Sequence, residues 1–379
     1  MRELALEEVF PRVAEIVADV RDRGDEALLD WSERLDGERP SALRVRAEEL
    51  AAARLDERSL RAIRQMAKAV EAFHAPQRPA DTSVTTLPGI VAERRFRPLG
   101  SVGIYVPGGR APLASSLVMT AVPAQLAGVP RVAVTTPRPR EAVLATAREL
   151  GLDEVYAVGG AQAIAALAYG TESIAPVDKI VGPGNRWVTA AKLLVASRVA
   201  VDFPAGPSEV LVVADESADP AQCAADLLAQ AEHGPDSEAI LVTTSAALAA
   251  AVRPLCDGRA TIEVVESLAA AIARADEYAP EHLELLVADP ETAATQVANA
   301  GSIFLGTTAV LGDYAAGANH VLPTGGLARG AGALGLEAFL KPIQYVRASA
   351  EGLAAARETV EALARLEGLP LHAAAMAAR

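Results

Sequence analysis

From about residue 100 onward, short runs rich in β-branched residues alternate with alanine-rich stretches of helical length, and this alternation constrains the fold most. The predicted strands span residues 101–106, 131–136, 154–158, 179–181, 210–214, 239–244, 261–266, 283–287 and 302–305. The predicted helices between them span residues 111–127, 139–150, 161–169, 186–197, 219–233, 246–255, 268–275 and 291–300. Because such alternation is typical of parallel sheets covered by helices, the sequence predicts an α/β fold.

The length of the chain predicts a division into domains. Its 379 residues exceed the roughly 250–300 residues at which a single core stops growing. The predicted strands are also too many for one small domain, so we expect two sandwiches. Residues 1–75 are predicted to be helical, residues 84–95 extended, and residues 349–366 a helix near the end of the chain.

Charge and cysteine content exclude several classes of protein. The formal net charge of −14 repels phosphate backbones, so no nucleic-acid partner is expected. The two cysteines, Cys223 and Cys256, have neither metal-binding nor redox spacing, which fits a reducing compartment. The N-terminus has the pattern of a charged amphipathic helix rather than a signal peptide, and no apolar run is long enough to predict a membrane span. We therefore expect a cytoplasmic protein without a membrane partner.

Histidine is scarce, with five in the chain, and it is both a proton carrier near neutral pH and the commonest metal ligand. His74 ends a predicted helix before Pro76, where it can complement the helix dipole as an ordinary surface or core residue. Gln230 and His233 lie three residues apart on a predicted helix, so both side chains can reach one ion. A solvated last helical turn explains the same spacing.

Two further segments place polar residues where sites are often built. Glu281 and His282 precede a predicted strand, and adjacent side chains there point in different directions, so the two residues can serve different steps of acid–base chemistry. An exposed strand entrance is the alternative. Asp313 lies in a glycine-rich loop that runs from Gly312 to His320 and is a candidate oxygen ligand for a metal. An ordinary Asx-type turn is the alternative for this loop.

Glycine-bearing turns indicate where a nucleotide can approach the backbone. The turns that end in Gln162 and Asn185 each follow a predicted strand and start a helix, and a third turn follows Tyr105. None of them has GxGxxG spacing. The GxGxxG match at residues 330–335 follows no predicted strand, so we exclude it as a cofactor loop. The absence of HExxH, GxSxG and Walker A motifs disfavours common zinc proteases, α/β-hydrolases and P-loop enzymes.

Taken in order along the chain, several segments resemble the histidinol dehydrogenase family. They are RPLGSVGIYVPGG, VGGAQAIAALAYGTESI, VDKIVGPGN, DFPAGPSEVLVVAD, DLLAQAEHGPDSE, YAPEHLE, AGSIFLG, GDYAAGANHVLPTGG and EGLPLH, and they span residues 97–372. The resemblance implies an oxidoreductase of histidine biosynthesis that oxidises L-histidinol to L-histidine through L-histidinaldehyde. It also implies two NAD molecules per turnover and one zinc ion per subunit.

Matching the family's motifs residue by residue implies roles for single side chains. Glu281 and His282 would form the catalytic acid–base pair. The implied zinc ligands are Gln230, His233, Asp313 and His372. The implied substrate contacts are Ser208, Gln230, His233, His282, Asp313, Glu367 and His372. The implied NAD contacts are Tyr105, Gln162 and Asn185.

The resemblance also gives the expected architecture, which is two Rossmann-like, incomplete three-layer sandwich domains with a helical N-terminal region. We expect a first α/β domain made of residues 1–104 together with 210–330, and a second, NAD-side α/β domain at residues 105–209. Residues 331–379 would form a small helical dimerisation tail. In the implied homodimer this tail reaches the partner subunit, so that Glu367 and His372 complete the partner's site.

Two alternatives remain. A paralogous zinc- and NAD-dependent dehydrogenase would keep the acid–base pair but oxidise another small polyol or amino alcohol. The presence of Glu367 favours histidinol over such substrates. A non-catalytic nucleotide-binding or regulatory protein would keep only the fold. The presence of Glu281, His282, Asp313 and His372 argues against that second alternative.

Overall fold

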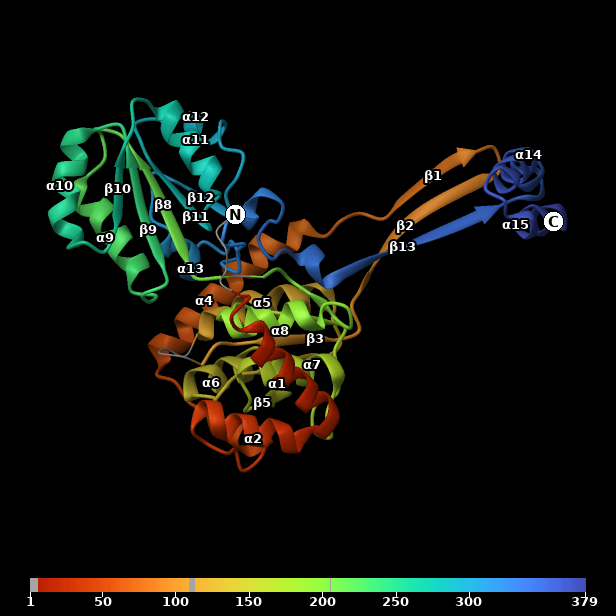
Figure 1. Ribbon diagram of the computed structural model, residues 1–379, viewed down its shortest axis with the longest axis horizontal. Helices are drawn as coiled ribbons and strands as arrows, with labels where there is room; N and C mark the ends of the chain where they lie inside the picture. Colours follow the sequence, from red (N-terminus) through yellow and green to blue (C-terminus); the bar gives the residue numbers. More distant parts are fainter. Residues whose placement is uncertain (1–5, 109–112, 205) are drawn as a thin grey trace. The chain divides into compact units, whose positions relative to one another are not determined.

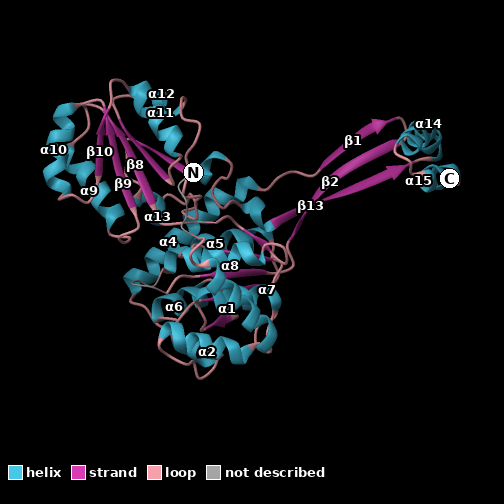
Figure 2. Cartoon of the chain, in the orientation of Figure 1, coloured by secondary structure: helices cyan, strands magenta, loops and turns pink. Residues whose placement is uncertain are grey.

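The computed structural model describes residues 6–108, 113–204 and 206–379, and it divides into two compact units. Unit 1 combines Met1–Gln77 with Leu99–Phe339, and unit 2 combines Arg78–Pro98 with Leu340–Arg379. Figure 1 follows both units along the chain, and Figure 2 shows their helices and strands. No helix of the described residues has both the length and the apolar character that crossing a bilayer requires.

The first lobe of unit 1 is a five-stranded parallel sheet with the strand order β5-β4-β3-β6-β7. Its strands are β3 (Val102–Tyr105), β4 (Val132–Thr135), β5 (Val155–Tyr156), β6 (Lys179–Val181) and β7 (Ala200–Val201). Its helices are α5 (Ala114–Ala127), α6 (Glu141–Glu149), α7 (Gly160–Tyr169) and α8 (Arg186–Val195). The first residues of the helix predicted at 111–127 lie outside the described residues.

The second lobe of unit 1 is another five-stranded parallel sheet, with the order β10-β9-β8-β11-β12. Its strands are β8 (Glu209–Ala214), β9 (Glu238–Thr243), β10 (Thr261–Val264), β11 (His282–Leu286) and β12 (Ser302–Leu305). Its helices are α9 (Pro220–Ala231), α10 (Ala246–Cys256), α11 (Leu268–Tyr278), α12 (Pro290–Ala294) and α13 (Val310–Tyr314). Helices α9 and α10 cover one face of the sheet and α11 and α12 the other, so β8 is buried along its whole length (Figure 1).

The predicted α/β class with two parallel sheets is confirmed, and all the predicted strands are present with ends that differ by only a few residues. β8 is the clearest case, because a run of aliphatic residues without alternation is typical of a strand covered on both faces. β7 was not predicted, since its two residues give no periodic signal.

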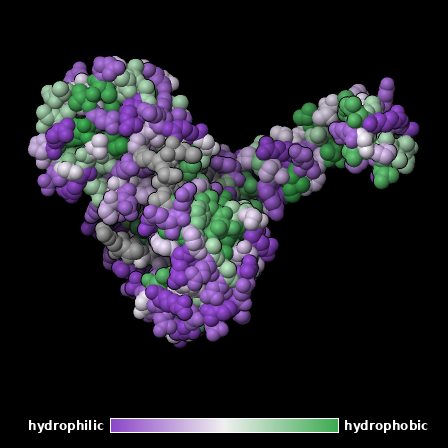
Figure 3. All heavy atoms as spheres, in the orientation of Figure 1, coloured by the Kyte–Doolittle hydropathy of each residue, from purple (hydrophilic) through white to green (hydrophobic). Residues whose placement is uncertain are grey.

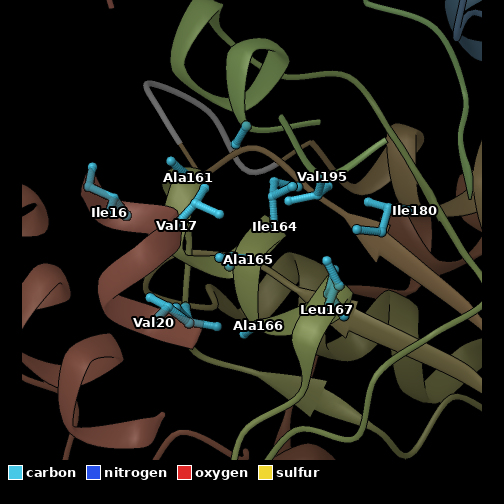
Figure 4. Close-up of a cluster of buried hydrophobic side chains, with 14 of the residues drawn as sticks. Ile16, Val17, Val20, Ala161, Ile164, Ala165, Ala166, Leu167, Ile180 and Val195 are labelled. Carbon is cyan, nitrogen blue, oxygen red and sulfur yellow. The ribbon is translucent and has the colours of Figure 1, made fainter. Parts of the chain in front are cut away.

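The predicted domain boundary at residue 104 is wrong in two respects. The strand β3, expected in the first α/β domain, is the central strand of the first lobe. The N-terminal helices α1 (Phe10–Arg23) and α2 (Asp25–Asp36) also share the core of that lobe rather than that of the lobe formed by residues 210–330. Figure 4 shows Ile16, Val17 and Val20 of α1 beside the residues of α7. The alanines of α7 allow the close approach of α1, and nothing in the sequence of α1 identifies that partner.

Three other elements complete the N-terminal helical region and its connections. Helix α3 (Ala47–Ala52) contacts α6, and helix α4 (Glu57–His74) packs against α5 of the first lobe. Short 3₁₀ turns occur at η1 (Ala75–Gln77), η2 (Leu327–Arg329) and η3 (Leu336–Phe339).

Unit 2 contradicts the expectation of a purely helical tail at residues 331–379. It contains a three-stranded antiparallel sheet of β1 (Thr82–Leu87), β2 (Ile90–Pro98) and β13 (Leu340–Ala348), followed by α14 (Ala350–Leu366) and α15 (Pro370–Ala377). Residues 331–339 belong to unit 1. β13 pairs with β2, a strand some 250 positions earlier in the sequence, so its partner gives no local signal.

The packing of α2 gives a test of the corrected boundary. Leu28 is fully buried in the core shared with α7 and α8, so Leu28→Ala should lower the free energy of unfolding by about 2–5 kcal/mol. The same substitution at Leu35, on the same helix but 53 % exposed, should cost less than about 0.5 kcal/mol. Urea unfolding measures both, and equal small losses would show that α2 does not belong to this core.

Candidate active site

The predicted catalytic residues line a small cavity of about 150 Å³ in unit 1. The second lobe contributes Ser208, His233, Glu281, His282 and Asp313, which belong to the end of α9, the entrances of β8 and β11, and α13. The first lobe contributes Ser116 and Pro183. The structure therefore brings together five of the side chains that the sequence analysis singled out at separate positions.

Glu281 is held at the entrance of β11 by two donors. Its Oε2 atom accepts hydrogen bonds from the Ser208 hydroxyl at 2.6 Å and from the Glu209 amide at 2.9 Å. Burial raises the pKa of Glu281 to about 7, although these two donors act in the opposite direction. Gly301 lies against this turn, where a Cβ atom would approach the Glu281 carbonyl to 2.6 Å. A larger residue at position 301 would therefore displace the carboxylate.

His282 is the first residue of β11 and is buried rather than exposed, so the alternative of an exposed strand entrance is wrong. Its Nδ1 atom lies 3.3 Å from the Glu209 carbonyl oxygen, and its Nε2 atom lies 4.0 Å from Asp313 Oδ1. Burial lowers the pKa of His282, which favours the neutral ring. A proton on Nδ1, donated to the Glu209 carbonyl, leaves Nε2 as the acceptor that faces the cavity.

Asp313 lies in the short helix α13 rather than in an ordinary Asx-type turn. Its Oδ1 atom lies 4.0 Å from His282 Nε2 and 3.6 Å from His320 Nδ1. Burial raises the pKa of Asp313, while His282 and His233 lower it. His233 follows the last turn of α9, and Gln230 in that turn is buried with its Nε2 atom lacking a hydrogen-bond partner among the described residues. These side chains offer nitrogen and oxygen donors of the kind that zinc accepts.

A complete metal centre is not assembled within the described residues. No group of three or more His, Cys, Asp or Glu side chains among them could hold a metal ion. Unit 1 supplies Gln230, His233 and Asp313 of the predicted ligands, and only His233 and Asp313 belong to these four residue types. Glu367 and His372 belong to unit 2, where Glu367 caps the end of α14 and His372 lies in α15, both with exposed side chains.

His320 also lines the cavity, and sequence reasoning did not single it out. Its Nδ1 atom lies 3.6 Å from Asp313 Oδ1, and its Nε2 atom lies 3.4 Å from the Ser116 hydroxyl. Burial, followed by the neighbouring His282, lowers the pKa of His320 to about 4, so the ring is neutral at physiological pH. The polar density of the loop from Gly312 to His320 was the available signal.

His74 is a buried core residue, as one of its two expected interpretations stated. Its Nδ1 atom lies 2.8 Å from the Val70 carbonyl oxygen, and its Nε2 atom lies 3.4 Å from the amide nitrogen of Asn319. Asn319 also donates to the Met119 carbonyl. Because Asn319 precedes His320, this network fixes the backbone beside the cavity.

Tyr105, Gln162 and Asn185, predicted as NAD contacts, line a second cavity of about 360 Å³ at the carboxyl ends of the first-lobe strands. Gln162 is fully buried, and neither its amide nitrogen nor its amide oxygen has a hydrogen-bond partner among the described residues. The Tyr105 hydroxyl accepts a hydrogen bond from the Gly160 amide at 3.3 Å. Asn185 caps α8 by accepting from the Trp187 and Val188 amides. An orphaned amide of this kind can bind a polar group, from water or from a ligand, in the cavity.

A third cavity of about 740 Å³ adjoins both of the others, and we call it the connecting cavity because it shares lining residues with each. It shares Asn185 and Trp187 with the Gln162 cavity, and Ser208 and His233 with the cavity around Glu281. The three cavities therefore form a series of neighbours from Gln162 to Glu281 and His282.

Glu284 is a buried carboxyl that contacts elements carrying residues of the cavity around Glu281. It lies two residues after His282 on β11, and its Oε1 atom accepts a hydrogen bond of 2.5 Å from the amide of Ala309, the residue that precedes α13. Burial and the negative charge of Asp226 on α9 raise the pKa of Glu284 to about 8. Glu284 is thus predominantly protonated at neutral pH and joins the three elements that position Gln230, His282 and Asp313.

Comparisons with known proteins agree on one family. The family model described as histidinol dehydrogenase matches residues 1–379. Histidinol dehydrogenase of Methanopyrus kandleri is 46 % identical over 100 % of this chain and 95 % of its own length, and that of Photobacterium profundum is 44 % identical over 97 % and 88 %. The crystal structure of histidinol dehydrogenase from Elizabethkingia anophelis superposes with a TM-score of 0.92 at 37 % identity and covers 98 % of this chain and 92 % of that chain.

The protonated Glu284 predicts a pH-dependent difference in stability. Its pKa is about 8 in the folded chain against an ordinary value of 4.5, so the folded state holds a proton that the unfolded state releases. Its stabilising contribution is therefore present below pH 4.5 and is lost as the pH rises through about 8.

Glu284→Gln keeps a neutral acceptor for the Ala309 amide and removes this titration. Relative to the parent, its free energy of unfolding should rise by on the order of 3 kcal/mol between pH 5 and pH 8. Denaturant titrations at several pH values measure the difference. Glu291→Gln, an exposed control, should give a constant difference, and a constant difference for Glu284→Gln as well would contradict a buried proton.

Proposed function

The chain belongs to the histidinol dehydrogenase family, and from this premise we propose that it oxidises L-histidinol to L-histidine through L-histidinaldehyde, using two NAD and one zinc ion per subunit. The observation that most supports the chemistry is the pair of neighbouring side chains, Glu281 and His282, in one buried cavity with different environments. Pairs of titratable groups with different environments are typical of acid–base catalysis.

His282 is the base of the first step. With Nδ1 directed at the Glu209 carbonyl, the neutral ring accepts the proton of the substrate hydroxyl at Nε2. Bound NAD accepts the hydride that leaves the carbon atom bearing this hydroxyl. The ring of Phe304, with its centroid 5.8 Å from that of His282, limits the movement of the imidazole.

Glu281 is the base of the second step, in which water adds to the aldehyde. Its Oε2 atom is occupied by the Ser208 and Glu209 donors, which leaves Oε1 to take a proton from the water. A pKa of about 7 allows the carboxyl to accept that proton and release it again near neutral pH. As water adds, the protonated His282 gives its proton to the aldehyde oxygen, so the ring is neutral again. His282 then accepts the proton of the resulting hydrate as the second hydride leaves to a second NAD.

The donor set fits zinc, which would be held by Gln230, His233 and Asp313 together with His372. Zinc held there would orient the substrate through the nitrogen donors of its amine and imidazole. The orphaned Nε2 atom of Gln230 is consistent with a side chain whose amide oxygen is directed at an ion. Burial lowers the pKa values of His282 and His320, so these two rings add no positive charge beside the ion.

NAD would occupy the Gln162 cavity and extend through the connecting cavity toward His282. The Gln162 amide has no hydrogen-bond partner among the described residues. Its nitrogen can donate to a phosphate or carbonyl oxygen of the nucleotide, and its oxygen can accept from an amino or amide group. The paralogue acting on another polyol or amino alcohol is the second candidate. Ser208 and Glu367, which suit an amine or imidazole, favour histidinol over it.

Unit 2 has a surface that favours a homodimer with shared sites. Leu363 and Leu366 of α14 and Leu369 and Leu371 around the start of α15 are 40–81 % exposed. Figure 3 shows hydrophobic residues among hydrophilic ones on the outer surface of this unit. Because large apolar side chains on adjacent helices are typical of an interface, we propose that this surface binds a second copy and delivers Glu367 and His372 to its site. The free cysteines Cys223 and Cys256 fit a cytoplasmic location for this dimer.

The proposed activity is tested by the yield of NADH from L-histidinol. Two NADH should form per histidinol, a chelator should abolish the reaction, and zinc should restore it. His282→Asn should lose at least about 100-fold in turnover, because it removes a base, while binding the same amount of zinc as the parent. Turnover of another alcohol without turnover of histidinol would overturn the proposal, and loss of zinc from His282→Asn would overturn the role of that residue.

The shared site is tested by mixing two inactive variants, His372→Ala and Glu281→Gln. In a heterodimer one site receives both defects and the other receives neither, so a randomly mixed sample should recover about a quarter of the parent activity. Refolding the variants together and assaying the mixture measures this recovery, and the separated heterodimer should reach about half of the parent activity. An inactive heterodimer of confirmed composition would indicate that each subunit builds its own site.

A further inference from the structure

The connected cavities continue beyond Gln162. A fourth cavity of about 630 Å³ shares Asp36, Pro137 and Arg138 with the Gln162 cavity. In order, the series runs from the cavity around Glu281, through the connecting cavity, to Gln162 and then to Asp36. Asp36 and Arg138 therefore lie where the Gln162 cavity meets the fourth cavity, and neither residue lines the cavity around Glu281.

The strand order of the first lobe indicates which part of a dinucleotide would lie near Asp36 and Arg138. From β3 the chain moves to β4 and β5 on one side of the sheet, and then to β6 and β7 on the other, so a crevice forms at the carboxyl end of β3. In open α/β sheets of this strand order a dinucleotide lies across that crevice. The adenosine ribose is contacted by a side chain at the carboxyl end of the second strand of the sheet, which here is β4. Pro137 and Arg138 follow β4.

The local geometry of Arg138 and Asp36 suits contact with a ligand. Arg138 is exposed and has a φ of 44°, a left-handed conformation that is strained for a residue with a side chain. Asp36, the last residue of α2, is half-buried, which raises its pKa, while the Arg138 charge lowers it. Neither side chain makes a hydrogen bond or an ion pair within the part of the chain that the structure describes.

We propose that Asp36 and Arg138 recognise the 2′ position of the adenosine ribose, and that Asp36 makes the site selective for NAD over its 2′-phosphorylated form. This inference rests on the proposed function, because it places a dinucleotide in these cavities. A carboxylate accepts a hydrogen bond from a 2′-hydroxyl but repels a 2′-phosphate. With Asp36 neutralised, Arg138, together with Arg44 on the same wall, offers positive charge to that phosphate.

The experiment uses ADP-ribose and 2′-phospho-ADP-ribose as probes, so that it needs neither turnover nor metal. Calorimetry on the full chain should show that the parent binds ADP-ribose at least about tenfold more tightly than the 2′-phosphorylated probe. Asp36→Asn keeps the size of the side chain and removes its charge. Its affinity for the 2′-phosphorylated probe should rise by about tenfold, with a smaller loss for ADP-ribose.

Two matched variants separate a local effect from a general one. Adding Arg138→Ala to Asp36→Asn should remove the gain, because the phosphate then lacks its partner. Glu38→Gln changes a carboxylate on the wall of the fourth cavity that the Gln162 cavity does not share, and it should leave the preference of the parent intact. If Asp36→Asn does not fold, Asp36→Ser provides the same test.

Equal binding of the two probes by the parent, or an unchanged preference in Asp36→Asn, would overturn the inference. Absence of ADP-ribose binding by a parent that oxidises histidinol with NAD would overturn it too. Selective binding by a parent that does not oxidise histidinol would leave the inference standing and refute the proposed function instead.

Discussion

The parallel pairing of β11 with β8 and β12 is the constraint on which the site depends. This pairing places His282 opposite Val210 on one side and Ser302 on the other, so the proposed catalytic pair lies at the same edge as the start of β8. The Ser208 hydroxyl and the Glu209 amide then meet the Glu281 carboxylate, and the Glu209 carbonyl meets His282. A shift of one residue in register would reverse the facing of the β11 side chains and separate these groups.

Local sequence patterns predict the two sheets but not how the remaining segments attach to them. The buried strands are recognisable in the sequence as aliphatic runs, because helices cover both of their faces. β13 is largely exposed and pairs with β2 over a separation of some 250 residues, so neither burial nor proximity marks it as a strand. Helix α1 has a clear apolar stripe, but a stripe specifies that a helix packs and not which lobe it packs on.

The site was predictable to a different extent. Spacing alone left Glu281 and His282 as possible residues of an exposed strand entrance, and the family motifs gave the roles that the cavity now accommodates. The sequence analysis did not identify His320 and Glu284. Both are marked by burial beside a carboxyl group, that of Asp313 for His320 and that of Asp226 for Glu284, and burial is not visible in the sequence. The orphaned amide of Gln162 is likewise a property of the packed structure, since a glutamine in an alanine-rich helix has no unusual pattern.

Glu281 and Glu284 illustrate how one strand and its entrance hold two carboxyls for different purposes. Both are buried, and burial raises both pKa values. Glu281 receives two hydrogen bonds on one oxygen, which keep its pKa near 7, and it faces a cavity where a proton can be exchanged. Glu284 receives one and faces the charge of Asp226, and it does not line the cavity around Glu281. Access to the cavity, rather than the pKa alone, therefore separates a proton carrier from a structural carboxyl.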